Sequence, residues 1–353
     1  MSREWKQALH ESLRQQRILS EPAALRLAQQ DAAPWFMDLL SGLAAWLAAL
    51  LLIVSLLFTF IDDSPLGVAL AGVLLLGSAV WLLCRPGAFV SQLGLALSLV
   101  GQGMLVMSVS QLALWSSYPE RPPAVVAALV AIGMLLVPAS AVHRLACALI
   151  VMAGVAVFIG FNGLLALYGV LLATLATGIW LLRSRWAGNG LAGLWRAAAG
   201  AATVAALVLP MLGDRRWADR MIELVGAEIG LWWMWLHPVG AGLLLLAVTG
   251  YLLRGQRAEM RLSGLGAALL LIVPGFQAPG LLVAAALWLA VFHAADRLWC
   301  VVVGLGAALY LGDLYYSLHI SLLQKSGLLV ASGMVLLALR WFLSWRWGEA
   351  DEG

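Results

Sequence analysis

Long apolar runs separated by short polar turns occupy the sequence from residue 39 onwards. Apolar runs of about 18 or more residues are typical of transmembrane helices. The pattern therefore predicts an all-α fold, a polytopic transmembrane helix bundle with about 12 spans. The predicted spans cover residues 39–60, 66–83, 90–111, 124–141, 145–160, 163–182, 194–212, 230–253, 262–273, 280–292, 298–314 and 326–343.

Two of these runs, 262–273 and 280–292, are shorter than a straight span requires. Proline removes a backbone donor and glycine relaxes the chain, so the segment between the two runs is expected to interrupt regular helix. The pair is either two short spans joined by a tight turn or one broken, re-entrant element buried in protein or lining a cavity. The candidate helix-breaking residues are Pro274, Gly275, Pro279 and Gly280.

The ends of the chain differ from its apolar body. In residues 1–38, Trp5 and Leu9 lie at helical spacing among charged residues, which predicts a cytoplasmic amphipathic helical segment. This segment has no apolar stretch behind a basic start, so a cleaved signal peptide is not expected. The transmembrane helical domain is predicted at 39–347, and 348–353 forms a short cytoplasmic tail.

Composition supports the membrane class. Hydrophobic residues make up 63% of the chain and charged residues 11%, whereas a soluble domain is about 25% charged. The lipid bilayer is therefore the first expected partner. No basic tract with interleaved aromatic residues occurs, so no nucleic-acid partner is expected.

The basic residues predict the orientation. With the N-terminus inside, 16 of the 21 basic residues fall on the cytoplasmic side, as the positive-inside rule requires. Both termini are then cytoplasmic (N-in/C-in). A re-entrant element at 262–292 would weaken this bias. The five basic residues on the other side are Arg121, Arg215, Arg216, Arg220 and Lys325.

Tryptophans gather at the ends of the runs, where an indole typically anchors in the headgroup zone. The loop 213–229 has one apolar and one charged helical face, which predicts an interfacial helix on the outer surface. The predicted tryptophan anchors are Trp81, Trp115, Trp180, Trp186, Trp299, Trp341, Trp345 and Trp347.

No motif for a known chemistry is present. The sequence lacks HExxH, GxSxG, a Walker A loop and a dinucleotide fingerprint. The three cysteines are expected to be packing thiols, and single histidines such as His143 and His237 are expected to be interfacial or hydrogen-bonded within the fold rather than metal ligands. Gln102 is among the few polar residues within spans and is expected to bond between helices. No catalytic residue, metal site or cofactor is predicted.

One stretch, residues 310–326, gathers several polar and ionisable groups between two apolar runs. From Tyr316 onwards it alternates as a strand does, and a helical pattern fits almost equally well. It is a loop anchored by its tyrosines with Asp313 paired to Lys325, a segment that docks a partner, or a catalytic or transport site. The candidate partner-contact or polar-site residues are Asp313, Tyr315, Tyr316, His319, Gln324 and Lys325.

The sequence also resembles a known family over roughly its whole length, most strongly after residue 270. Gln277-Ala-Pro-Gly280, Tyr315-Tyr316-Ser-Leu, Leu322-Leu-Gln-Lys325-Ser326 and Ser332-Gly-Met-Val-Leu-Leu-Ala-Leu-Arg340-Trp341 resemble the bacterial membrane family called domain of unknown function 4401. The N-terminal Leu13-Arg-Gln-Gln-Arg-Ile18-Leu19-Ser20 is similar to the opening of domain of unknown function 2157. The resemblance implies a multispanning protein of the bacterial inner (cytoplasmic) membrane without assigned activity. It also implies a partner, a membrane protein with a GDYXXLXY domain.

Three functions remain open at this point. The first is a non-catalytic component that docks another envelope protein through its outer face. The alternative is a transporter or channel for a small solute, built around the break at 274–280. The third is a membrane-embedded enzyme on a lipid-linked substrate, with His319 and Asp313 as its acid–base pair. A continuous polar cavity at the break would favour transport, and a closed, apolar-filled bundle would favour docking.

Overall fold

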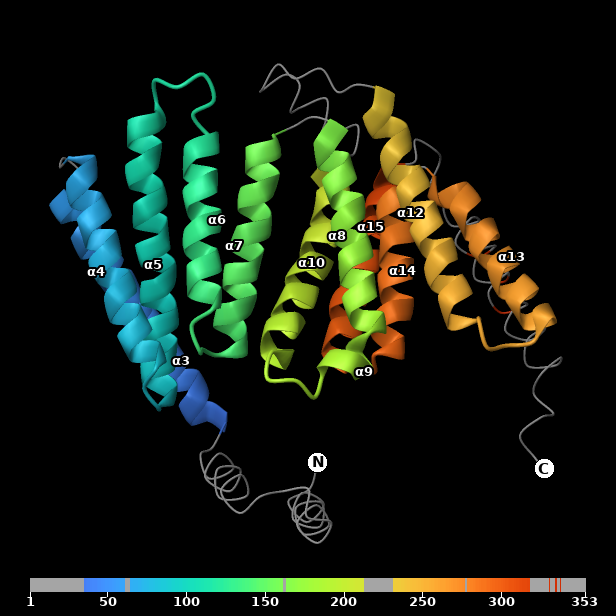
Figure 1. Ribbon diagram of the computed structural model, residues 1–353, viewed down its shortest axis with the longest axis horizontal. Coiled ribbons are helices and arrows are strands. Elements are labelled where there is room, and N and C mark those ends of the chain that lie inside the picture. Colours follow the sequence, from blue (N-terminus) through green and yellow to red (C-terminus); the bar gives the residue numbers. More distant parts are fainter. Residues whose placement is uncertain are drawn as a thin grey trace, which may run out of the picture. The chain divides into compact units, whose positions relative to one another are not determined.

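A computed structural model describes residues 35–60, 64–160, 163–212, 231–276 and 278–317, and the single residues Val330, Met334 and Leu337. Within these ranges the chain is helical and contains no strand (Figure 1). It divides into two compact units, Met1–Phe158 and Ile159–Gly353. The all-α class is therefore confirmed.

The first unit holds α3 (Trp35–Phe60), α4 (Pro65–Leu83), α5 (Ala88–Ala113), α6 (Arg121–Leu135) and α7 (Ala141–Ile159), the last of which ends at the boundary. The second holds α8 (Gly163–Leu181), α9 (Arg183–Trp186), α10 (Ala192–Leu212), α12 (Leu231–Leu252), α13 (Ala258–Gly275), α14 (Pro279–His293) and α15 (Arg297–Ser317).

Each of the first eleven predicted runs overlaps mainly with one helix, and the largest error is at 124–141, whose helix α6 ends at Leu135. The run 66–83, for example, corresponds to α4, and 280–292 corresponds to α14. Seven helices of the described part are long and apolar enough to cross a membrane, as expected of an integral membrane protein: α4, α5, α7, α8, α10, α12 and α15. Nearly all of the twelfth run, the interfacial helix predicted at 213–229 and residues 1–34 lie outside the described residues.

Small residues bring the helices of the first unit into close contact. A Cβ on Gly72 of α4 would lie 3.1 Å from the carbonyl oxygen of Gly101, and one on Gly154 of α7 would lie 2.8 Å from that of Ala124. Backbones approach this closely only where no side chain intervenes, which is the usual way that membrane helices associate. The Ser108 hydroxyl of α5 also donates a 2.6 Å hydrogen bond to the carbonyl of Pro65.

The short helix α14 is the most enclosed element of the second unit. It packs against α8, α10, α12, α13 and α15. A helix that is apolar on all sides is stable only when it is surrounded. The sequence of α14 is apolar on all sides and five helices surround it, so its side chains form the centre of the unit. Seven of them are at most 2% exposed: Leu282, Val283, Ala284, Ala286, Leu287, Ala290 and Val291.

Candidate functional site

The proline–glycine segment separates two helices in the structure. Pro274 and Gly275 occupy the last turn of α13, and Pro279 and Gly280 open α14. Gly275 is buried, and a Cβ on it would overlap the side chain of Leu282. The connection is therefore tight and filled by an apolar side chain. Pro279 stands at the start of its helix, where its missing N–H costs no hydrogen bond.

Gly280 lies directly against the ring of Tyr310 in α15, which is 7% exposed. The Tyr310 hydroxyl donates a hydrogen bond to the backbone carbonyl of Leu207 in α10. Three residues further along α10, Pro210 cannot donate to the carbonyl of Ala206, so the regular ladder is interrupted at this level. This contact brings together the two regions that the sequence singled out: the break at 274–280 and the start of the stretch 310–326.

The polar stretch begins as helix. Asp313, Tyr315 and Tyr316 lie in the last turns of α15, so the extended-strand alternative is wrong for Tyr316 and Ser317. The alternating pattern gave the wrong prediction at these two residues because the helix α15 continues for about two turns past Tyr310 and includes them. Tyr316 is 79% exposed, and its ring centroid lies 5.5 Å from that of Tyr315 in an edge-to-face arrangement.

Asp313 is exposed on the same helix end. His319, Gln324 and Lys325 lie outside the described residues, so the pairing of Asp313 with Lys325 stays a prediction.

The expectation that Gln102 bonds between helices is confirmed, but sequence reasoning did not find the buried polar network between α5 and α7 to which it belongs. The Ser98 hydroxyl lies 3.0 Å from Nε2 of His143, and the Gln102 amide nitrogen donates to Ser98 Oγ at 3.1 Å. Cys147 Sγ lies 3.7 Å from His143 Nε2 and 3.8 Å from the Gln102 amide nitrogen. All four side chains are at most 3% exposed. The available signal in the sequence was the four-residue spacing of Ser98 and Gln102 and of His143 and Cys147, because this spacing places each pair on one helix face.

This network is better suited to holding α5 and α7 together than to catalysis. It satisfies the polar atoms of its members within the core, except for Gln102 Oε1, which has no partner. In the described part of the chain, no group of three or more His, Cys, Asp or Glu side chains could hold a metal ion.

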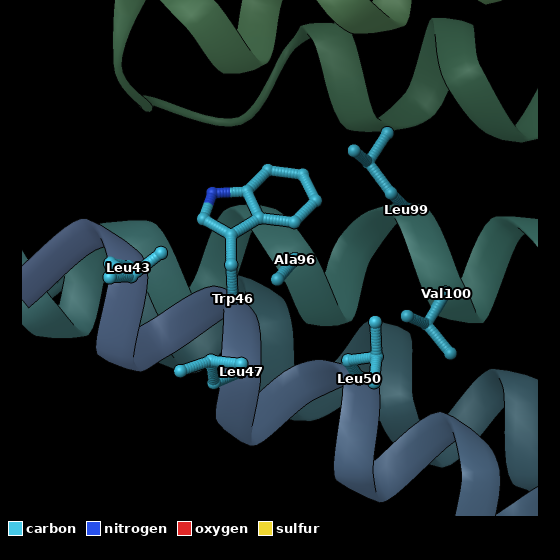
Figure 2. Close-up of a pocket in the computed structure, with 7 residues that line it drawn as sticks. All are labelled: Leu43, Trp46, Leu47, Leu50, Ala96, Leu99 and Val100. Carbon is cyan, nitrogen blue, oxygen red and sulfur yellow. The ribbon is translucent and has the colours of Figure 1, made fainter.

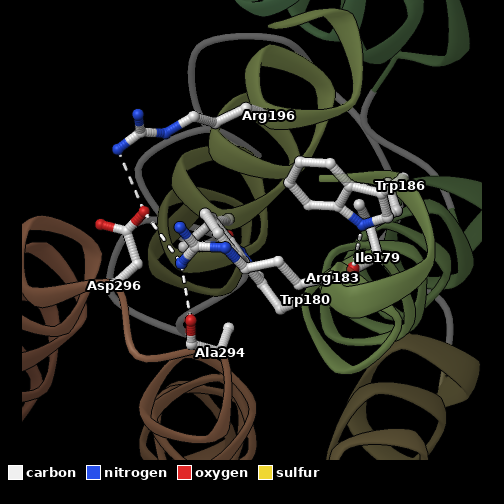
Figure 3. Close-up of polar contacts among 8 residues, drawn as sticks. Ile179, Trp180, Arg183, Trp186, Arg196, Ala294 and Asp296 are labelled. Atoms are coloured by element: carbon white, nitrogen blue, oxygen red, sulfur yellow. Dashed lines mark hydrogen bonds and ion pairs between the residues drawn. The ribbon is translucent and has the colours of Figure 1, made fainter. Parts of the chain in front are cut away.

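A second unpredicted cluster joins three segments of the second unit (Figure 3). Asp296, in the turn between α14 and α15, is 6% exposed. Its Oδ2 accepts a hydrogen bond from Arg196 Nη2 of α10 at 3.0 Å and lies 3.4 Å from Arg183 Nη1, at the start of α9. Arg183 Nη1 also donates to the carbonyl of Ala294 at 2.6 Å. One carboxylate therefore holds two guanidinium groups.

Three tryptophans pack together near this cluster. The ring centroid of Trp180 lies 6.5 Å from that of Trp186 and 5.9 Å from that of Trp299. The Trp180 indole donates to Thr203 Oγ1 at 3.0 Å, and the Trp186 indole donates to the carbonyl of Ile179 at 2.8 Å. All three are at most 8% exposed. The prediction that these three rings anchor in the headgroup zone is therefore wrong, because the rings bury their area against each other and bond inside the protein. Trp81 and Trp115 are exposed, at 59% and 96%.

The arginines of the second unit gather at one of its ends. The turns at 182–191, 253–257 and 294–296 lie on the same side of this unit, since its long helices run in alternate directions (Figure 1). The acidic residues described at this end are Glu259 and Asp296, whereas Asp313 lies at the opposite end. The seven arginines described in this unit all lie in or beside these turns: Arg183, Arg185, Arg196, Arg254, Arg257, Arg261 and Arg297.

His237 of α12 is the most isolated polar side chain of the second unit's described core. It is 5% exposed, and neither ring nitrogen has a hydrogen-bond partner. A Cβ on Gly169 of α8 would lie 3.4 Å from its Nε2 and 3.6 Å from Cβ of Leu209 in α10. The imidazole therefore lies among three helices, within van der Waals distance of a Cβ at position 169.

The first unit has an apolar pocket of about 400 Å³ between α3 and α5 (Figure 2). No charged side chain lines it. Its lining residues are Leu43, Trp46, Leu47, Leu50, Ala96, Leu99 and Val100.

Comparison with known proteins gives one match. The family model described as "Domain of unknown function (DUF4401)" matches residues 34–346. No curated protein and no solved structure matches the chain.

Proposed function

The chain belongs to the DUF4401 family, and from that premise we propose that it is a non-catalytic component of the bacterial inner membrane that docks another envelope protein through its outer face. The observation that carries the proposal is the closed packing of the second unit. α14 is enclosed by apolar side chains, and the Tyr310 ring covers Gly280. Likewise, the Leu282 side chain fills the space beside Gly275, where a solute path through the proline–glycine segment would have to open.

The exposed end of α15 supports a contact site. Tyr316 presents most of its ring outward beside Tyr315, and aromatic side chains of this kind dominate the binding energy of protein interfaces. Asp313 adds a charge at the same end. The partner that we propose is the membrane protein with a GDYXXLXY domain that the family resemblance implies.

The proposed topology has about twelve spans with both termini in the cytoplasm. Its support is the distribution of charge in the second unit, where the seven described arginines all lie at one end, whereas the sequence has three arginines, Arg215, Arg216 and Arg220, in the loop at the other. Under the positive-inside rule the arginine end is cytoplasmic. Asp313, Tyr315 and Tyr316 then face the outer side, where an envelope partner would reach them.

Transport of a small solute is the second candidate, and one observation favours it. An ionisable residue inside a membrane bundle is costly and often marks a solute or proton path. His237 is such a residue, and both of its ring nitrogens lack a partner. It is a single group, however, and the described residues around it provide no acid that would make a relay.

The test is recovery of the partner from native membranes. The full chain carrying Tyr315→Ala and Tyr316→Ala is compared with the wild type by affinity purification and mass spectrometry. We expect recovery of the GDYXXLXY-domain protein to fall at least about tenfold, since hot-spot aromatics each contribute about 2 kcal/mol. Tyr118→Ala is the matched control, because Tyr118 is a 54% exposed tyrosine in a turn predicted on the same side.

Equal recovery from the double variant would remove the docking role of α15. A loss of solute uptake in cells carrying His237→Leu, with partner recovery unchanged, would favour the transporter instead.

A further inference from the structure

We propose that Arg183 and Arg196, braced by Asp296, bind the phosphate of an anionic phospholipid headgroup at the arginine end of the second unit. This proposal rests on the membrane character of the chain and does not depend on the docking function.

The charge at this cluster is unbalanced. Two guanidinium groups share one carboxylate oxygen, Oδ2 of Asp296, so the three side chains carry one net positive charge. Arg185 and Arg297 add two more exposed cations, and residues 182–196 contain no acid at all. An anion at this place would meet attraction on several sides.

Hydrogen-bond donors remain available on both arginines. Arg183 uses Nη1 for Ala294 and Asp296, which leaves Nε and Nη2, while Arg196 uses Nη2, which leaves Nε and Nη1. A guanidinium presents its donors as a planar fork that fits the two free oxygens of a phosphodiester. Two adjacent forks whose remaining donors are unused are therefore suited to one phosphate group.

The burial of the three side chains orients them. Asp296 is 6% exposed, whereas the side chains of Arg183 and Arg196 are 33% and 50% exposed. The acid is thus on the inside, and it holds the two cations at the surface in a fixed geometry. Preorganised side chains lose little conformational entropy when a ligand binds, which distinguishes this pair from an ordinary exposed arginine.

The neighbouring surface favours a lipid over a free anion. Trp195, directly before Arg196, is 43% exposed, and Leu182, directly before Arg183, is 38% exposed. Leu191 and Leu298, in the adjoining turn and first turn of α15, are 62% and 63% exposed. Exposed apolar side chains next to a basic site suit a ligand that presents a phosphate and an acyl chain together, and basic sites between helix ends are known to take such headgroups.

The test measures thermal unfolding of the purified full chain in detergent, with phosphatidylglycerol, phosphatidylcholine or inorganic phosphate added. We expect phosphatidylglycerol to raise the midpoint and phosphatidylcholine to leave it unchanged, because its own cation neutralises the phosphate. Inorganic phosphate at the same concentration should also have no effect. An equal rise with phosphatidylcholine would overturn the proposal. An equal rise with inorganic phosphate would show a site for a soluble anion and would overturn it too.

Two variants locate the site. Arg196→Gln should lose at least half of the shift caused by phosphatidylglycerol, whereas Arg254→Gln should keep it. Arg254 is the matched control because it lies in another turn of the same end, is exposed and stacks on Tyr251. If both variants lose the shift equally, the effect is general charge and the proposal fails.

If Arg196→Gln does not fold, Arg196→Lys tests whether Arg196 binds the lipid phosphate. It keeps the charge and removes the fork, so it should lose part of the shift. A lysine variant with the full shift would contradict the proposed recognition of phosphate by the guanidinium.

Discussion

The ring of Tyr310 in α15 fills the space above Gly280 in α14, and any Cβ at position 280 would overlap it. The same tyrosine is tied to α10 through its hydroxyl and the Leu207 carbonyl. One aromatic residue of α15 thus contacts both α14 and α10, and it requires glycine on one side and an accessible backbone carbonyl on the other. This relationship closes the second unit at the proline–glycine segment.

Gly280→Ala should therefore destabilise the protein. Overpacking of a filled core typically costs about 1–3 kcal/mol, and the Tyr310 ring cannot move away without losing its bond to Leu207. The measurement is the midpoint of thermal unfolding in detergent. Gly312→Ala in α15 is the control, because a Cβ there would meet nothing within 4 Å. If the two substitutions had the same effect, the contact between Gly280 and Tyr310 would contribute nothing.

The buried tryptophan cluster gives a second prediction. Trp180→Phe removes the indole N–H that donates to Thr203 and leaves a cavity at a position that is 0% exposed. We expect a loss of about 1–3 kcal/mol in the free energy of unfolding, from the unmade bond and the cavity together. Trp115→Phe, at a position that is 96% exposed, should change it by less than about 0.5 kcal/mol. Similar losses in both variants would indicate that Trp180 is not packed as described.

The helices could be predicted from the sequence because membrane spans leave a local pattern. An apolar run has to be about as long as a span, so 66–83 predicted α4 to within one residue of its start. The proline at position 65 and the hydroxyl of Ser64 explain that boundary, since both favour a helix start.

The polar clusters could not be predicted in the same way, because their members are far apart in sequence. Asp296 is 113 residues from Arg183 and 100 residues from Arg196. By itself, an acid next to Arg297 in a short turn indicates a solvated surface. Trp180 likewise resembles an interfacial anchor by its place at the end of a run, and only the fold reveals the ring packed against it. The family resemblance, confirmed by the match over residues 34–346, did not carry these pairings.

The predicted topology can be tested with reporter fusions. The distribution of basic residues places the C-terminus inside and the stretch around Lys325 outside. Fusions of alkaline phosphatase and green fluorescent protein after Gly353 and after Ser326 should therefore report opposite sides of the membrane. The same side for both fusions would contradict twelve spans with both termini in the cytoplasm.

The ion pairs of Asp296 with Arg183 and Arg196 should stabilise the fold more than an ordinary surface ion pair does. Asp296→Ala leaves Arg183 and Arg196 without their shared acid, and breaking a fully buried pair costs about 3–5 kcal/mol. Because both arginines are partly exposed, we expect a smaller loss of about 1–3 kcal/mol in the free energy of unfolding. Glu259→Ala removes an exposed acid from the same end and should cost less than about 0.5 kcal/mol. Chemical unfolding of the two variants in one detergent separates these outcomes.

Thiol labelling tests the polar network between α5 and α7. Cys147 is 0% exposed and contacts His143 and Gln102, whereas Cys84, at the end of α4, is exposed. N-ethylmaleimide should modify Cys84 in the folded protein at least about tenfold faster than Cys147, because a buried thiol reacts only when its surroundings open. Mass spectrometry of single-cysteine variants, Cys84→Ser with Cys300→Ser and Cys147→Ser with Cys300→Ser, measures each rate separately.

The substitution Ser98→Ala removes one bond to His143 and should speed the labelling of Cys147, because the polar contacts that hold α7 against α5 are weakened. Ser110→Ala is the control, because that hydroxyl bonds only to the Val106 carbonyl within its own helix. Equal labelling of Cys84 and Cys147 in the wild type would contradict the buried network, and an unchanged rate in Ser98→Ala would remove Ser98 from it.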